Sequence, residues 1–287
     1  MGTLLLIVDM LAQQAEVMIV RAYGKRHGAG GTFFNAIICL FAMRFFILTD
    51  KGGLCFPAEL WGYGLVSCLM FATGFYTLYV ALQLGSYVTT RLISSFSVVI
   101  AIIYGIAFLK ESATPVTYTA IIMFLVAMFM VNYSGGQNSG EKKGFSVKWL
   151  VYTLLVAISN GLISVIMREQ QIHFDSAYDN EFMIISLGGA AAFLFVYGFI
   201  KEGSNFASII KKGTVYGLGA GLLNGSKNLL ALVLCLYIPI SVLTPIRTGL
   251  AFVSSFLISV FLYKEKFSKL QLAGVILGIL SIILFNV

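Results

Sequence analysis

Two stretches of the chain, one in each half, repeat the same order of charged, polar and apolar residues. Residues 108–132 read FLKESATPVTYTAIIMFLVAMFMVN, and residues 262–286 read LYKEKFSKLQLAGVILGILSIILFN. With one constant offset and no gap, Lys110 aligns with Lys264, Glu111 with Glu265 and Asn132 with Asn286. Each copy ends one apolar segment with a Lys-Glu pair and begins a second apolar segment after a polar turn. Such an internal repeat indicates one structural unit that is built twice.

The composition places this repeated unit in a membrane. Of the 287 residues, 59% are hydrophobic and only 11% are charged, whereas soluble domains carry about 25% charged residues. A helix needs about 20 mostly apolar residues to cross the hydrocarbon core. The sequence therefore predicts an all-α integral membrane protein with ten transmembrane helices, near 2–20, 32–49, 59–81, 87–109, 115–134, 148–168, 181–200, 214–236, 240–263 and 268–287.

The ten predicted helices form two groups of five. Residues 1–134 make the first five-helix repeat, 135–147 a polar linker rich in Gly, Ser and Lys, and 148–287 the second repeat. Because five is an odd number, the second repeat enters the membrane upside down relative to the first. Two inverted repeats of this kind are an architecture of secondary transporters.

The positive charges indicate an orientation and a location. Twelve Lys or Arg residues lie in the turns after the first, fifth, seventh and ninth predicted helices, and four lie on the opposite side. The positive-inside rule then places both termini outside the cell. The net charge of +7 follows from this bias and indicates no nucleic-acid partner. We expect a multi-pass protein of the cell (plasma or inner) membrane, surrounded by the lipid bilayer, either a monomer or a homodimer.

Charged residues inside the predicted helices are the candidate functional residues, because a charge at a helix centre costs about 2.5–3.5 kcal/mol on insertion scales. Asp9, Gln13 and Glu16 follow one another at spacings of four and three residues, so they share one helical face. On residues 214–236, a second polar face carries Asn224, Lys227 and Asn228. Beside it, a stripe of small residues predicts a close helix contact, and it consists of Gly217, Gly221 and Gly225.

Other predicted helices add single polar residues to the candidate site. Arg247 and Thr244 lie within residues 240–263, Asn160 within 148–168 and Tyr76 within 59–81. Lys227 has two interpretations, a salt bridge with Asp9 or Glu16 and a direct role in binding substrate or protons. By contrast, Glu111 and Glu265 follow helix ends, so we expect them to cap the helices at 115–134 and 268–287.

Together these residues resemble the EamA-like permeases of the drug/metabolite transporter superfamily. The likeness rests on Lys264-Glu265 followed by Gly274 to Gly278, on the stretch from Gly221 to Asn228, and on the segment around Pro245. The resemblance covers nearly the whole chain. It implies a basket of helices around a central pocket that works by alternating access.

The leading hypothesis is a secondary transporter, or permease, for a small polar metabolite such as an amino acid or an organic anion. Cationic and amide side chains would bind the cargo, with help from Tyr76 and Thr244. Burial favours the neutral form of a carboxyl group, so Glu16 or Asp9 could exchange a proton as the coupling ion. The expected substrate-binding residues are Arg247, Lys227, Asn224, Asn228, Asn160, Tyr76 and Thr244.

Two other functions remain open at the level of sequence. In a proton-coupled exporter of drugs or other cationic compounds, Glu16 would attract the cargo and aromatic residues such as Tyr76 would contact it. An intramembrane enzyme would need a nucleophile and a base or a metal site, and the sequence has no HExxH, no GxSxG and no His-Cys cluster. We therefore expect no enzymatic activity, no metal site and no cofactor.

Overall fold

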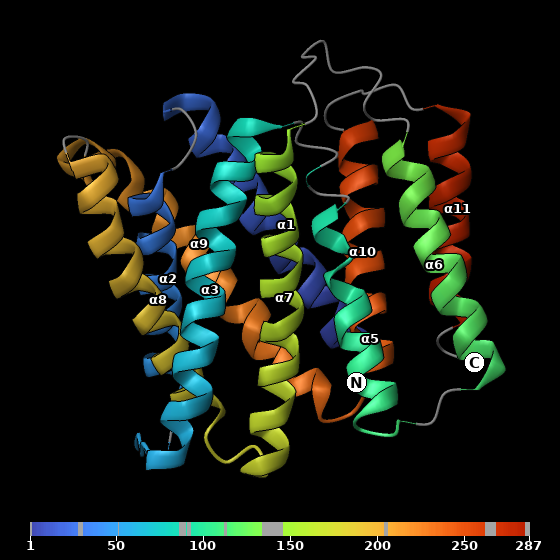
Figure 1. Ribbon diagram of the computed structural model, residues 1–287, viewed down its shortest axis with the longest axis horizontal. Coiled ribbons are helices and arrows are strands. Elements are labelled where there is room, and N and C mark those ends of the chain that lie inside the picture. The colour runs from blue at the N-terminus through green and yellow to red at the C-terminus, as the bar shows by residue number, and fades with distance from the viewer. Residues whose placement is uncertain are drawn as a thin grey trace. The chain divides into compact units, whose positions relative to one another are not determined.

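The computed structural model describes residues 2–27, 31–50, 52–85, 90, 93–111, 114–133, 146–203, 206–261 and 268–284. Within these residues, every regular element is a helix (Figure 1). The helices are α1 (Gly2–His27), α2 (Thr32–Thr49), α3 (Ala58–Leu84), α5 (Ser97–Ala107), α6 (Pro115–Tyr133), α7 (Val147–His173), α8 (Asp179–Glu202), α9 (Phe206–Cys235), α10 (Ile240–Phe261) and α11 (Lys269–Leu284).

Several of these helices are suited to cross a membrane. Among the described residues, α2, α3, α7, α8 and α9 are long and apolar enough to do so, and three shorter helices are also apolar. This confirms a multi-pass, all-helical membrane protein, while the count of ten spans stays a prediction. Parts of the predicted pattern lie outside the described residues, among them Lys264, Glu265, Asn286 and most of the linker.

The helices group into two compact units. Unit 1 contains Met1–Tyr79 and Leu162–Leu234, and unit 2 contains Val80–Gly161 and Cys235–Val287. Each unit therefore takes helices from both halves of the chain. The predicted repeats, 1–134 and 148–287, concern the order of helices along the sequence and not this spatial grouping. They stay a prediction.

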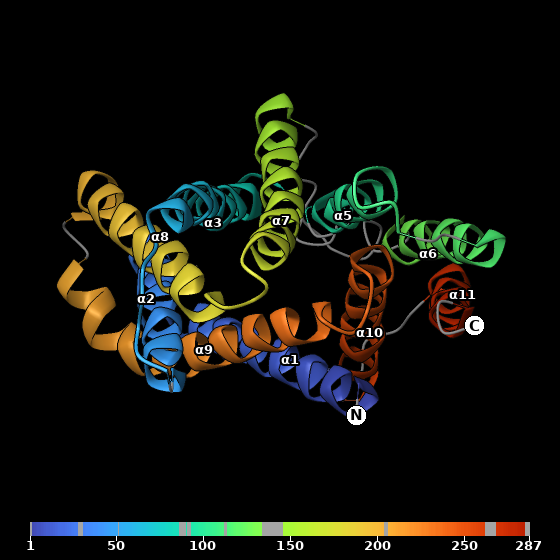
Figure 2. The same cartoon turned by 90° about the horizontal axis from the view of Figure 1, so that it is seen from below.

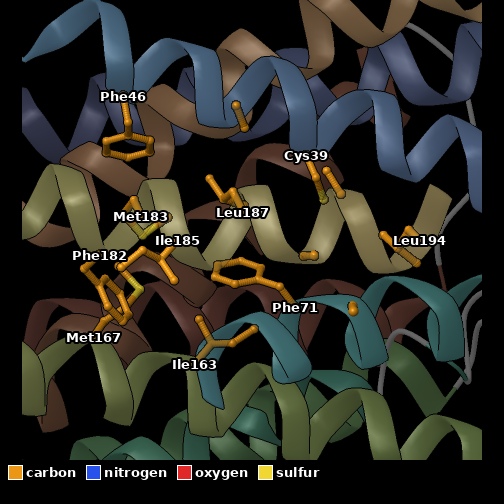
Figure 3. Close-up of a cluster of buried hydrophobic side chains, with 14 of the residues drawn as sticks. Cys39, Phe46, Phe71, Ile163, Met167, Phe182, Met183, Ile185, Leu187 and Leu194 are labelled. Carbon is orange, nitrogen blue, oxygen red and sulfur yellow. The ribbon is translucent and has the colours of Figure 1, made fainter. Parts of the chain in front are cut away.

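In unit 1, α2 and α8 pack side by side and run in opposite directions. Gly198 of α8 faces Phe33 at the start of α2, whereas Gly188 faces Met43 near its end. Apolar side chains fill the interface and the space toward α3 (Figure 3), with Phe46, Phe182 and Leu187 fully buried. Burial of such large side chains from water stabilises a fold by roughly 1.5–3 kcal/mol each, and in lipid their close packing supplies the contact energy instead.

The predicted glycine stripe lies at the contact between α9 and α2, so this prediction is confirmed. A Cβ atom on Gly221 would lie 2.7 Å from the carbonyl oxygen of Ile38 and 3.1 Å from the backbone nitrogen of Ala42. One turn further along α9, a Cβ atom on Gly225 would lie 2.7 Å from the ring of Phe45. The two helices can approach this closely only because these positions carry no side chain.

Unit 2 repeats the antiparallel arrangement of unit 1 with other helices. The helices α6 and α11 pack against each other (Figure 1). Ala127 of α6 contacts the Gly278 position of α11, while Phe124 and Ile282 approach the same glycine of α10, Gly249. Gly105, near the end of α5, lies against Ile240 at the start of α10, so these two helices also run in opposite directions.

The glycine contact can be tested by adding one methyl group. Because the Cβ atom of Gly221→Ala would meet the backbone of α2, which cannot move aside cheaply, we expect a loss of about 1–3 kcal/mol in stability. Gly62→Ala on α3 is the matched control, since nothing lies within 4 Å of its Cβ position. This control should be neutral or slightly stabilising. Thermal unfolding in detergent measures both, and equal melting temperatures would contradict the contact.

Candidate functional site

The polar faces of α1 and α9 meet inside unit 1, where the two helices lie side by side (Figure 2). Lys227 Nζ donates to Glu16 Oε2 at 2.6 Å, which forms an ion pair. Asn224 Nδ2 donates to the other carboxylate oxygen, Glu16 Oε1, at 2.8 Å. Asn228 Nδ2 donates to Asn224 Oδ1 at 2.9 Å. Four of the predicted site residues are therefore joined in one hydrogen-bonded chain.

This chain of contacts is largely shielded. Asn224 is 2% exposed and Asn228 is 9% exposed, and the side chains of Glu16 and Lys227 are 10% and 26% exposed. A lone charge in such surroundings would carry a large desolvation cost, and pairing offsets it. The structure thus shows that Glu16, one of the two carboxylates that the sequence offered, is an ion-pair partner of Lys227.

Asp9 lies two helical turns before Glu16 on α1. Its side chain is almost fully buried, and its carboxylate accepts a hydrogen bond of 2.7 Å from Gln13 Nε2. Along the predicted polar stripe of α1, Asp9 and Glu16 are therefore buried and Gln13 is half-buried. Its role in proton exchange stays a prediction.

Tyr76 of α3 also belongs to unit 1. It accepts a hydrogen bond of 3.1 Å from the hydroxyl of Tyr197, and the two rings meet edge to face with centroids 4.8 Å apart. Tyr76 also packs against the apolar core of the unit. Tyr76 therefore belongs to an aromatic pair with Tyr197, a partner that the sequence did not reveal, and its contact with the cargo stays a prediction.

The remaining candidates belong to unit 2. Arg247 is half-buried on α10. One turn earlier, Thr244 uses its hydroxyl to bond the carbonyl of Ile240 within the same helix, at 2.9 Å. Asn160 occupies an exposed position on α7. The assignment of these three residues to the cargo site stays a prediction.

Glu111 has a structural role that the sequence analysis placed on the wrong helix. Its two carboxylate oxygens accept hydrogen bonds from the backbone N–H groups of Ile240 and Ser241, at 2.9 and 3.0 Å. It therefore caps α10, which carries Arg247, and not α6 as expected. The turn that aims it back includes Lys110 in the left-handed region, with φ of 53°, a conformation that is uncommon for a residue other than glycine.

Comparison with known proteins adds a family to this geometry. The model of the EamA-like transporter family matches residues 2–133 and 147–287. A solved crystal structure, titled only as that of a protein, shares the fold with a TM-score of 0.76 and 15% sequence identity; the match covers 99% of this chain and 95% of that one. A search of the curated proteins finds no match.

Removal of the Glu111 charge should loosen the start of α10. Charge-assisted bonds to helix N-terminal amides contribute about 0.5–2 kcal/mol, so Glu111→Gln should lower the free energy of unfolding by that amount. Glu59→Gln is the control, because Glu59 is an exposed acid in the first turn of α3. Thermal melting of the two purified variants decides the point, and equal loss in both would contradict a specific cap.

The ion pair itself should show strong coupling between its members. Lys227→Met leaves Glu16 without its cation, which should cost about 3–5 kcal/mol. The double variant Glu16→Gln with Lys227→Met removes both charges, so it should regain a large part of that loss. A double-mutant cycle on melting curves measures the coupling. Additive effects would mean that the two side chains do not interact in the folded protein.

Proposed function

We propose that this chain, which belongs to the EamA-like transporter family, is a secondary transporter that moves a small polar metabolite across the cell membrane by alternating access. The cargo class that we infer is an amino acid or an organic anion. The observation that carries this proposal is the buried ion pair of Glu16 and Lys227, with Asn224 bonded to the same carboxylate. Charges at this depth are costly to keep, so they are typical of substrate and ion pathways.

Helix packing supports an inverted-repeat architecture for this transporter. The pairs α2 with α8, α5 with α10 and α6 with α11 are the equivalent helices of the two predicted repeats, and each pair packs together. In the pairs α2 with α8 and α5 with α10, the start of one helix meets the end of the other. A two-fold axis in the membrane plane would produce this pattern. We therefore retain ten spans in two inverted five-helix repeats, 1–134 and 148–287, as part of the proposal.

Each candidate residue has a proposed role. Lys227, Asn224 and Asn228 would bind the anionic group of the cargo, with Arg247, Thr244, Asn160 and Tyr76 as further contacts. Glu16 and Asp9 would exchange the coupling proton. The proposal includes no cofactor and no chemical step, and among the described residues no group of three or more potential metal-ligating side chains occurs.

One observation favours a second function, the export of cationic compounds. Two of the buried carboxylates in unit 1, Asp9 and Glu16, lie on α1, and the unit also holds an aromatic pair, Tyr76 with Tyr197. Aromatic faces and carboxylates both attract organic cations. In that case Glu16 would bind the cargo and Lys227 would compete with it.

Flux through reconstituted vesicles tests the two functions together. We expect uptake of amino acids or organic anions, and a loss of about tenfold or more in the neutral double variant Glu16→Gln with Lys227→Met, because bonds to a charged group contribute about 1.5–3 kcal/mol. Lys211→Met, at an exposed position on the same helix, is the matched control. Full flux in the double variant would remove this pair from the site. Transport of lipophilic cations alone would favour the exporter.

A further inference from the structure

Two side chains of α9 together form a binding site for one carboxylate group. Asn224 and Lys227 are three residues apart, so they lie on the same helical face. Each donates a hydrogen bond to a different oxygen of the same group, with distances of 2.8 Å from Asn224 Nδ2 and 2.6 Å from Lys227 Nζ. We call this arrangement the Asn224–Lys227 fork. Its present occupant is the side chain of Glu16 from another helix.

Asn228 orients the amide group of Asn224 in the fork. Asn228 donates to Asn224 Oδ1 at 2.9 Å, so the network assigns the amide group of Asn224 with its nitrogen toward the carboxylate. Asn228 is therefore a positioning residue that does not itself contact the occupant in the observed network. A fork with a fixed donor direction is prepared for a carboxylate, which accepts one bond on each oxygen.

Charge and access set the conditions under which the occupant can be exchanged. Lys227 is the most exposed member of the site, with 26% of its side chain accessible, so an incoming anion meets the lysine first. The charges of Glu16 and Lys227 cancel each other. A second carboxylate can enter without leaving a net negative charge only if Glu16 takes up a proton at the same time.

We propose that Glu16 occupies the fork in place of the cargo, and that a solute with a single carboxylate group displaces it when Glu16 becomes protonated. This inference rests on the transport function proposed above and specifies its cargo and coupling. One proton from water goes to a Glu16 oxygen, the two hydrogen bonds of the fork transfer to the carboxylate of the solute, and the net charge of the site stays the same. Each carboxylate therefore enters with one proton, and release of both restores the ion pair.

The other groups around Glu16 fit this assignment. Asp9 and Gln13 lie on the same face of α1 and bond to each other. From α2, the buried thiol of Cys39 is close enough to interact electrostatically with both Glu16 and Lys227. Lys227 is the cation paired with Glu16, and it is held from a separate helix. Protonation of Glu16 would therefore directly release the hydrogen bonds of the Asn224–Lys227 fork.

The first experiment vacates the fork and refills it. Glu16→Ala deletes the carboxylate and one methylene group, and these deleted atoms correspond to an acetate ion. We expect acetate, and not chloride at equal ionic strength, to raise the melting temperature of Glu16→Ala, because a ligand of the folded form stabilises it. Wild-type protein at pH 8 and Glu16→Ala with Lys227→Met should show no such rise. Equal effects of acetate on the Glu16→Ala variant and on that double variant would overturn the proposal.

The second experiment counts protons in the unaltered protein. Titration calorimetry with acetate, lactate and pyruvate, in buffers of different ionisation enthalpy, should show uptake of about one proton per carboxylate bound. Because one proton enters with each carboxylate, the apparent affinity should then fall by up to about tenfold for each unit rise in pH. Glu16→Gln should bind without this pH dependence, whereas Glu59→Gln should behave as wild type. Succinate, with a second charge, should bind at least about tenfold more weakly.

The results separate this inference from the proposed function. If none of the three monocarboxylates binds, or if they bind without proton uptake, the exchange at the fork is wrong. Flux of another solute through vesicles would still support the transport function. If no solute crosses, but acetate refills Glu16→Ala, the fork exists and the transport function is wrong.

Discussion

A charge that is removed from water must find a partner, and this requirement organises the interior of unit 1. The carboxylate of Glu16 on α1 and the ammonium group of Lys227 on α9 satisfy each other at 2.6 Å. Their pairing fixes which face of α1 lies against α9, and it brings Asn224 and Asn228 into the same network. Without it, the polar stripe of α1 would have to face lipid, where each charge is costly.

Close packing, rather than charge pairing, holds α9 against α2. Lipid tails are as apolar as leucine side chains, so helices in a membrane associate by fitting closely. At Gly221 and Gly225, α9 comes close enough to α2 that a methyl group would strike its backbone or the ring of Phe45. This contact sets the position of α9, and therefore the position of Lys227 two residues beyond Gly225. The small residues and the charged residue thus act together on one helix.

The sequence predicted local features better than it predicted partners. The helix positions and the polar face of Asp9, Gln13 and Glu16 follow from hydrophobicity and periodicity, which depend on residues close in the chain. The cap made by Glu111 could not be predicted in this way, because its carboxylate oxygens accept hydrogen bonds from a helix that begins 129 positions later in the chain. An acidic residue that follows a helix end is expected to cap the next helix along the chain. Only the tertiary fold shows that Glu111 caps α10 instead. For the same reason, the sequence left two carboxylates as candidates for Lys227.

Glu16 and Glu111 both hold helices in place, but they differ in what can replace their partners. Glu111 is bonded to two backbone N–H groups at a helix start, and a solute could take its place only by uncapping α10. Glu16 is bonded to two side chains, one of them 26% exposed, and a solute carboxylate can offer those side chains the same two bonds. An exchange between equivalent partners costs little, provided that the charge stays balanced. A carrier needs contacts of this second kind, since it must both bind its cargo and release it.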